Sequence, residues 1–229
     1  MLQLKNKNRS YFYVFAFLFL TTITNHNYST ILSNFFLVKD VNIDVNSNEF
    51  RNILEKKTKF LINENIFFLD KELILNKVKS LKFIENIEIH KKFPSTIRIQ
   101  ANKTDLIAIT YINQNKYFVG LNGNFIPEKA VSNNKKLPVI FGKFNVNDYM
   151  EITNLLKKKN LNYNKINKYY FHKNKRWDLY FENNIIVMLP NKNIEYSLNI
   201  YQNFSKINQI KPNTIIDLRI PKRLILKSE

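Results

Sequence analysis

The chain has 229 residues, a formal net charge of +18 and no cysteine. Its length accommodates one or two small domains in addition to a membrane segment. The lack of cysteine excludes disulfides, thiolate nucleophiles and cysteine-based zinc sites. Only three glycines are present, and no Gly-x-Gly or Gly-Lys-Ser/Thr sequence occurs, which excludes a glycine-rich phosphate-binding loop.

The positive charge could indicate nucleic acid or an anionic membrane surface as a partner. The lysines, however, are spread along the whole chain, and asparagine is as numerous as lysine and arginine together. This bias is typical of A- and T-rich coding sequence and favours solvated surface lysines over a nucleic-acid site. We expect no nucleic-acid partner. A membrane-anchored nucleic-acid-binding protein stays open as a rival, and steeply salt-dependent binding would support it.

A single transmembrane helix is predicted near the N-terminus. Residues 1–10 form a short cytoplasmic tail, and no charged residue occurs between Arg9 and Lys39. Within this window, residues 11–20 read YFYVFAFLFL. Because a membrane span needs about 20 residues, we place the helix at residues 11–33.

The flanks of this segment predict its orientation. Lys5, Lys7 and Arg9 precede it, and an excess of positive charge marks the cytoplasmic side. Residues 21–29 (TTITNHNYS) offer no small-residue cleavage site, which favours a retained anchor over a cleaved signal peptide. The expected localisation is a single-pass protein of the bacterial inner membrane with its C-terminal domains in the periplasm.

The next segment, residues 38–105, predicts a compact α+β module of order strand, helix, helix, strand, strand. Apolar residues alternate over 41–45, which indicates a half-buried strand. Ser47 is placed to cap the first helix and Asp70 the second. The side chains expected to face inward from the second helix are Leu73, Ile74, Val78 and Leu81. The turn Phe93-Pro94-Ser95 joins the last two strands.

Residues 106–229 predict a β domain, mostly antiparallel, with two helices. Short strands are indicated around 107–112, 116–119, 166–171, 177–181, 185–189, 214–218 and 224–226. Asn113-Gln114-Asn115 and Glu182-Asn183-Asn184 are typical of turns between such strands. The helices are expected at 148–159 and from a cap near Asn193.

No catalytic or metal-binding constellation is visible in the sequence. The three histidines, His26, His90 and His172, belong to different predicted elements and lack a spacing suited to a metal. The sequence Arg176-Trp177-Asp178 is interpreted as a buried tryptophan whose charged neighbours point outward on a strand. We therefore expect no enzymatic activity and no cofactor.

The order of these segments resembles the FtsQ/DivIB family of cell division proteins over nearly the whole chain. The stretches that carry the resemblance are 41–45 (VNIDV), 65–70 (NIFFLD), 89–99 (IHKKFPSTIRI), 107–109 (IAI), 137–142 (LPVIFG), 176–177 (RW), 187–189 (VML) and 217–219 (DLR). The resemblance implies a cytoplasmic tail, one membrane span, a POTRA domain and a β domain.

The resemblance also implies a function. Proteins of this family are non-enzymatic scaffolds that link early and late divisome components and bind FtsB and FtsL in the periplasm. FtsK-like and septal peptidoglycan synthesis proteins are further candidate partners. The end of the β domain is expected to offer a sheet edge to the FtsB-like partner. The residues predicted for this contact are Ile220, Lys222, Arg223, Leu224, Ile225, Leu226, Lys227 and Ser228.

Other functions remain open at this point. An unpartnered closing strand is the simple alternative for residues 220–228. A POTRA-bearing component of outer-membrane protein assembly or secretion is an alternative for the whole chain, although such proteins carry repeated POTRA units or a long barrel. A periplasmic enzyme is the remaining rival.

Overall fold

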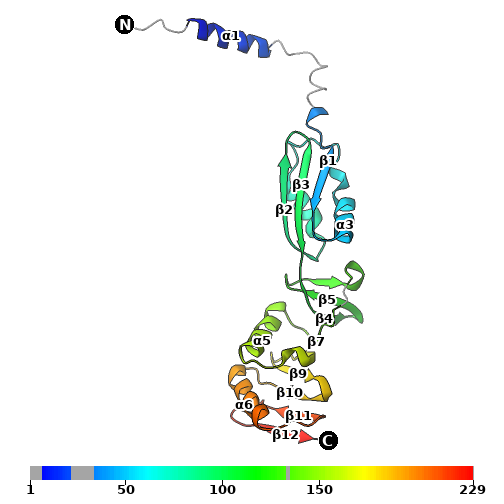
Figure 1. Cartoon of the computed structure of the whole chain (residues 1–229), viewed down its shortest axis with the longest axis vertical. Coiled ribbons are helices and arrows are strands. Elements are labelled where there is room, and N and C mark those ends of the chain that lie inside the picture. The colour runs from blue at the N-terminus through cyan, green and yellow to red at the C-terminus, as the bar shows by residue number, and fades with distance from the viewer. Residues whose placement is uncertain (1–6, 22–33, 133–134, 229) are drawn as a thin grey trace, which may run out of the picture. The chain divides into compact units, whose positions relative to one another are not determined.

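A computed structural model of the chain describes residues 7–21, 34–132 and 135–228 (Figure 1). Its first helix is α1 (Lys7–Thr21), which has 15 residues. Such a helix is about 22 Å long, whereas the hydrocarbon core of a bilayer is about 30 Å thick. No helix within the described ranges reaches the length and apolar character needed to cross a membrane. The second half of the predicted span, residues 22–33, lies outside the described residues.

The chain divides into two compact units. The first contains residues 1–80 and 86–102, and the second contains residues 81–85 and 103–229. Both mix helices and strands, so the predicted α+β class is confirmed.

The first unit has the predicted element order. Its elements are β1 (Asp40–Asp44), α3 (Asn48–Thr58), the 3₁₀ turn η1 (Lys59–Leu61), α4 (Lys71–Lys79), β2 (Ile84–Lys92) and β3 (Thr96–Lys103). The strands form a three-stranded sheet of order β1-β3-β2, in which β1 and β3 are parallel.

The helix caps of this unit are those expected from the sequence. The Ser47 hydroxyl accepts a hydrogen bond from the Phe50 amide at 3.3 Å, and the Asp70 carboxylate accepts one from the Glu72 amide at 2.9 Å. Ile74 and Val78 of α4 are fully buried. The inward position predicted for Leu73 is wrong: its side chain is 49% exposed, because Ile74 and Val78 alone define the buried stripe of this short helix.

The second unit is built on one nine-stranded sheet. Its strands are β4 (Leu106–Ile112), β5 (Asn115–Gly120), β6 (Phe125–Pro127), β7 (Val139–Gly142), β8 (Ile166–Phe171), β9 (Trp177–Phe181), β10 (Ile186–Met188), β11 (Thr214–Asp217) and β12 (Ile225–Ser228). They lie in the order β12-β11-β10-β9-β8-β7-β4-β5-β6. Two longer helices, α5 (Val146–Lys158) and α6 (Ile194–Ile207), accompany them as predicted.

The sheet is mixed, so the expectation of a mostly antiparallel sheet is wrong. The pairs β4–β7, β7–β8 and β10–β11 are parallel. The helices explain two of these pairs: α5 connects β7 to β8, and α6 connects β10 to β11. A helical crossover returns the chain to the same end of the sheet, which makes the joined strands parallel.

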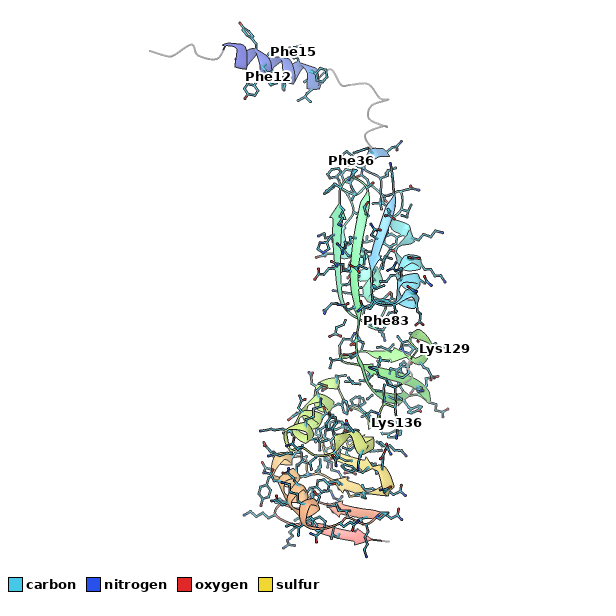
Figure 2. The ribbon with its side chains drawn as sticks, in the orientation of Figure 1. Phe12, Phe15, Phe36, Phe83, Lys129 and Lys136 are labelled. Atoms are coloured by element: carbon cyan, nitrogen blue, oxygen red, sulfur yellow. The ribbon has the colours of Figure 1, made fainter. Side chains whose placement is uncertain are left out.

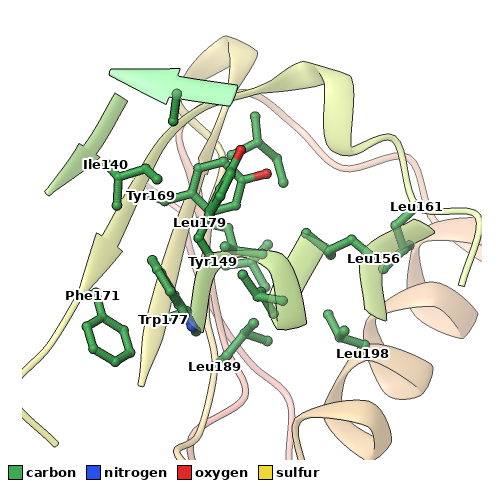
Figure 3. Close-up of a cluster of buried hydrophobic side chains, with 14 of the residues drawn as sticks. Ile140, Tyr149, Leu156, Leu161, Tyr169, Phe171, Trp177, Leu179, Leu189 and Leu198 are labelled. Atoms are coloured by element: carbon green, nitrogen blue, oxygen red, sulfur yellow. The ribbon is translucent and has the colours of Figure 1, made fainter. Parts of the chain in front are cut away.

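The helices cover one face of this sheet and enclose the core (Figure 3). This core contains Tyr149 and Leu156 of α5, Leu198 of α6, Tyr169 of β8 and Leu179 of β9. Trp177 is buried in the same cluster, as expected, and is only 3% exposed. The rings of Tyr149 and Tyr169 meet edge to face at 5.1 Å between centroids. Burial raises the pKa of Tyr149 to about 12, so this phenol stays neutral at physiological pH.

Local backbone details refine the predicted helix boundaries. Helix α5 begins at Val146, two residues before the predicted start, because Asn145 and Asp148 form a reciprocal capping box. Asn193 precedes α6 in the left-handed conformation and its side chain makes no capping hydrogen bond. The two-residue turn at Asn113 and Gln114 joins β4 to β5 with positive φ at both positions.

Candidate partner-binding edge of the C-terminal sheet

Strand β12 is an outer strand of the nine-stranded sheet. Within the described part of the chain its neighbour is β11, which it pairs antiparallel with Ile225 opposite Asp217 and Leu226 opposite Ile216. Its other edge therefore carries backbone groups that the described residues leave unpaired. This edge lies within residues 220–228, the segment for which the family resemblance implies a binding site.

The predicted site residues fall into a turn and a strand. Ile220 is 45% exposed, and its carbonyl accepts a hydrogen bond from the Arg223 amide at 3.2 Å. Lys222 lies in this turn with a φ of 63°. The strand begins at Ile225, one residue later than predicted, and Leu224 packs against the hydrophobic core. Lys227 is exposed, and the backbone of Ser228 pairs with Thr214.

Strand alternation gives the two faces of β12 different surroundings. Leu226 lies opposite the buried Ile216 and so shares the face that the helices cover, yet it is 48% exposed at the rim. Ile225 points to the opposite face and is 37% exposed. The edge thus presents one accessible apolar side chain on each face.

A charged pair lies directly beside this edge. The guanidinium of Arg219 donates to both carboxylate oxygens of Asp217, from Nε at 2.8 Å and from Nη2 at 2.5 Å. This hydrogen bonding lowers the pKa of Asp217 below its usual range and raises that of Arg219. Since Asp217 is buried and neutralised by Arg219, the charges of the nearby Lys222, Arg223 and Lys227 give this end of the sheet a basic character.

A second polar cluster continues along the same face of the sheet, and the sequence did not predict it. Asp178 was expected to point outward, but its side chain is 5% exposed and lies 2.6 Å from Nε2 of His172. Arg176 Nη1 lies 3.8 Å from its Oδ1, an atom for which no hydrogen-bond partner exists in the described part of the chain. Asp178 is buried because the side chains of His172 and Arg176 lie against it. Its strand is also flanked by β8 and β10, where Tyr170 and Met188 lie opposite it.

Cross-strand registers connect this cluster to the edge. Asp178 pairs with Met188, Met188 with Asp217, and Asp217 with Ile225. Residues in register point to the same face of a sheet, so a single row runs from the buried Asp178 to the exposed Ile225. Asp178 lies between Trp177 and Leu179 in a strand that has apolar strands on both sides. This pattern was the signal in the sequence for the burial of Asp178.

The histidines show no sign of a shared site. His90 belongs to β2 of the first unit and His172 follows β8 of the second, while His26 lies outside the described residues. Where the structure describes the chain, no group of three or more histidine and carboxylate side chains could hold a metal ion.

The two units together define a protein that carries a POTRA-type module in front of a mixed β domain with an open edge. Residues 36–103 match the model of the POTRA domain of FtsQ type, and residues 108–219 match that of the cell division protein FtsQ/DivIB, C-terminal. These matches cover most of the chain. It belongs to the FtsQ/DivIB family of cell division proteins.

Individual relatives agree with this assignment. The chain is similar to the cell division protein FtsQ of Rickettsia conorii, with 26% identity over 87% of this chain and 75% of the relative. FtsQ of Rickettsia bellii is 27% identical over 64% of this chain and 54% of its own length. FtsQ of Agrobacterium fabrum is 20% identical over 71% of this chain and 52% of its own length. The chain thus spans about half the length of the last two relatives.

Proposed function

We propose that this chain is a non-enzymatic scaffold of bacterial cell division whose strand β12 pairs with an extended segment of an FtsB-like protein. The observation that carries the proposal is the position of β12 at the margin of a nine-stranded sheet, next to β11 alone among the described strands. An added strand would satisfy the backbone groups of that edge, which is the usual physics of strand addition. Membership of the FtsQ/DivIB family supports the division role over outer-membrane protein assembly.

The opposite margin of the same sheet is poorly suited to pairing with an added strand. Strand β6 has three residues and ends in Pro127, which has no amide hydrogen to donate. Short edges and prolines are common protections against unwanted pairing. Strand β12 is one residue longer, and residues 225–228 contain no proline, since Pro221 lies in the preceding turn.

Side chains would add affinity and selectivity to the backbone pairing. Ile225 and Leu226 offer apolar contacts on the two faces of the edge, whereas Leu224 packs against the core of its own domain. Lys222, Arg223 and Lys227 favour an acidic partner segment and would mainly accelerate association. An FtsL-like protein, and FtsK-like and septal peptidoglycan synthesis proteins, are the further partners that we propose.

The proposed setting is the bacterial inner membrane, with the N-terminus in the cytoplasm and residues after about Lys39 in the periplasm. Its support is the charge-free window between Arg9 and Lys39 behind a basic tail. Within this proposal residues 1–10, 11–33, 38–105 and 106–229 are the tail, anchor, POTRA domain and β domain. A reporter that is active only in the periplasm, fused after Glu229, should be active in a full-length membrane-bound chain. A soluble, shortened product would contradict the anchor.

A titration of the purified full chain in detergent tests the binding proposal, with the periplasmic segment of the FtsB-like protein from the same organism as the ligand. Neighbouring residues of a strand direct their amide hydrogens to opposite edges. The substitutions Ile225→Pro and Leu226→Pro therefore remove one donor from each edge of β12. We expect one of them to weaken binding while the chain stays folded. Wild-type affinity in both variants would contradict the proposal.

A matched charge substitution tests the basic edge. Lys227 and Lys168 lie in the same cross-strand row and are both exposed, but Lys168 belongs to the central strand β8. The variant Lys227→Glu should associate more slowly, mainly at low salt, and Lys168→Glu should behave like the wild type. An equal effect of both substitutions would show that overall charge, and not the edge, guides the partner.

A further inference from the structure

Five phenylalanines of the first unit form what we name the aromatic patch: Phe35, Phe36, Phe67, Phe68 and Phe93. The rings of four of them are in contact, and Phe68 follows Phe67 in the chain. Ring centroids are 5.3 Å apart for Phe35 and Phe36, 4.7 Å for Phe36 and Phe67, and 4.9 Å for Phe67 and Phe93. Phe68 is 87% exposed, and Phe35, Phe67 and Phe93 are each more than half exposed. Figure 2 labels Phe36 at the end of the three-stranded sheet. Clusters of exposed aromatic side chains mark interaction sites.

Backbone hydrogen bonds hold the three segments of the patch together. The Ile66 amide donates to the Phe36 carbonyl at 2.9 Å, and the Val38 amide donates to the Glu64 carbonyl at 2.9 Å. The Lys39 amide donates to the Ser95 carbonyl at 2.8 Å, which fixes the turn that carries Phe93. The patch is therefore presented by an ordered backbone and needs little rearrangement to bind.

Basic residues lie beside the segments that carry the aromatic patch. Lys91 Nζ donates to the Phe67 carbonyl at 3.3 Å. Lys39 and Lys92, both exposed, are adjacent to the same turn. The exposed acidic residues near the patch are Asp40, Glu64 and Asp70. Phenylalanines framed by lysines suit the boundary between lipid headgroups and acyl chains, where the rings are buried and the ammonium groups meet anionic lipids.

The position of the patch in the chain favours the lipid bilayer as its binding partner. Phe35 follows the end of the predicted span, residue 33, by two positions, and two residues reach at most about 7 Å. We propose that the aromatic patch inserts into the interfacial region of the membrane that anchors the chain. This inference rests on the proposed membrane attachment, and it adds a second, non-spanning contact that would fix the orientation of the first unit at the bilayer surface.

Fluorescence quenching in reconstituted vesicles tests the inference. The full chain is placed in vesicles of phosphatidylethanolamine and phosphatidylglycerol, with and without brominated acyl chains. The variant Phe68→Trp adds a fluorophore to the patch, while the native Trp177 lies in the core and supplies a constant background. The matched control is Asn86→Trp. Asn86 is exposed on β2 and lies about 23 Å from Phe93 along the strand.

Loss of emission in brominated vesicles and a blue shift for Phe68→Trp, with neither for Asn86→Trp, would support the proposal. Equal quenching of the two variants would overturn the proposed membrane insertion of the patch. The same conclusion would follow if Phe68→Trp were not quenched in a chain that resists carbonate extraction, and the proposed anchor would then still stand. Release of the chain by carbonate would overturn both. Loss of a division protein from pull-downs with Phe68→Ser, together with unquenched Phe68→Trp, would assign the patch to a protein contact and refute the lipid one.

Discussion

His172 Nε2 lies 2.6 Å from Oδ2 of Asp178, a carboxylate with a side-chain exposure of 5%. Removing the imidazole would leave a buried carboxylate without this hydrogen-bond donor. We predict that His172→Ala lowers the free energy of unfolding by about 1–3 kcal/mol, as measured by chemical denaturation. The matched control is His90→Ala, whose exposed partner Glu88 lies at 3.3 Å and can be hydrated instead. Equal loss in both variants would contradict this reading of Asp178.

A pH dependence follows from the Asp217–Arg219 pair. Arg219 holds the pKa of Asp217 below its ordinary value of 3.8, so folding favours the ionised form of this carboxylate. The resulting stabilisation is fully present above the ordinary pKa and is lost as the pH falls through the lowered pKa. We therefore predict that Arg219→Gln destabilises the chain at neutral pH and that its difference from the wild type shrinks below a pH of about 4.

Thermal unfolding across pH, with Lys222→Gln as the control for loss of a nearby positive charge, checks this prediction. A difference between Arg219→Gln and the wild type that persists unchanged in acid would show that packing, and not the ion pair, is responsible.

The buried stripe of α4 can be tested by charge placement. Val78 is fully buried, so Val78→Asp should destabilise the first unit by more than about 3 kcal/mol because the carboxylate has no buried partner. Lys77→Asp should have a much smaller effect. Leu73→Asp, at a position predicted to be buried and found 49% exposed, should resemble Lys77→Asp. Circular dichroism during urea unfolding measures all three, and a collapse caused by Leu73→Asp would contradict the structure of α4.

Gly142 at the end of β7 is a position where a side chain cannot be accommodated. Its φ is 100°, and a Cβ atom would lie 1.9 Å from the carbonyl oxygen of Phe171 on β8. We predict that Gly142→Ala lowers the free energy of unfolding by at least about 2 kcal/mol. Gly123→Ala is the control, because Gly123 also has a positive φ but has no atom within 4 Å of that Cβ position. Similar losses would show that strain alone, without the clash, governs position 142.

The elements of the first unit could be predicted because their signals are local. Ser47 and Asp70 satisfy the first amides of the helices that follow them, and the turn at 93–95 lies between adjacent strands. Leu73 was misplaced because a helix of 9 residues leaves its apolar stripe poorly defined by the sequence alone.

The arrangement of the C-terminal sheet could not be predicted to the same extent. Thr110 of β4 pairs with Ile140 of β7, and the pairing depends on tertiary contacts across 30 residues, not on local pattern. The burial of Asp178 follows from the same arrangement, since it requires β8 and β10 on either side of β9. The candidate edge at 225–228 was placed from the resemblance, and its contact with a partner stays a prediction.

Hydrogen–deuterium exchange of the full chain, with and without the periplasmic segment of the FtsB-like protein, tests the central claim most directly. Strand addition would protect backbone amides of β12 that are unprotected in the free chain. The exchange protection of the hydrogen-bonded amides in the three-stranded sheet of the first unit should be unchanged. New protection within residues 225–228 is the predicted result. Tight binding without any added protection in this segment would contradict the account.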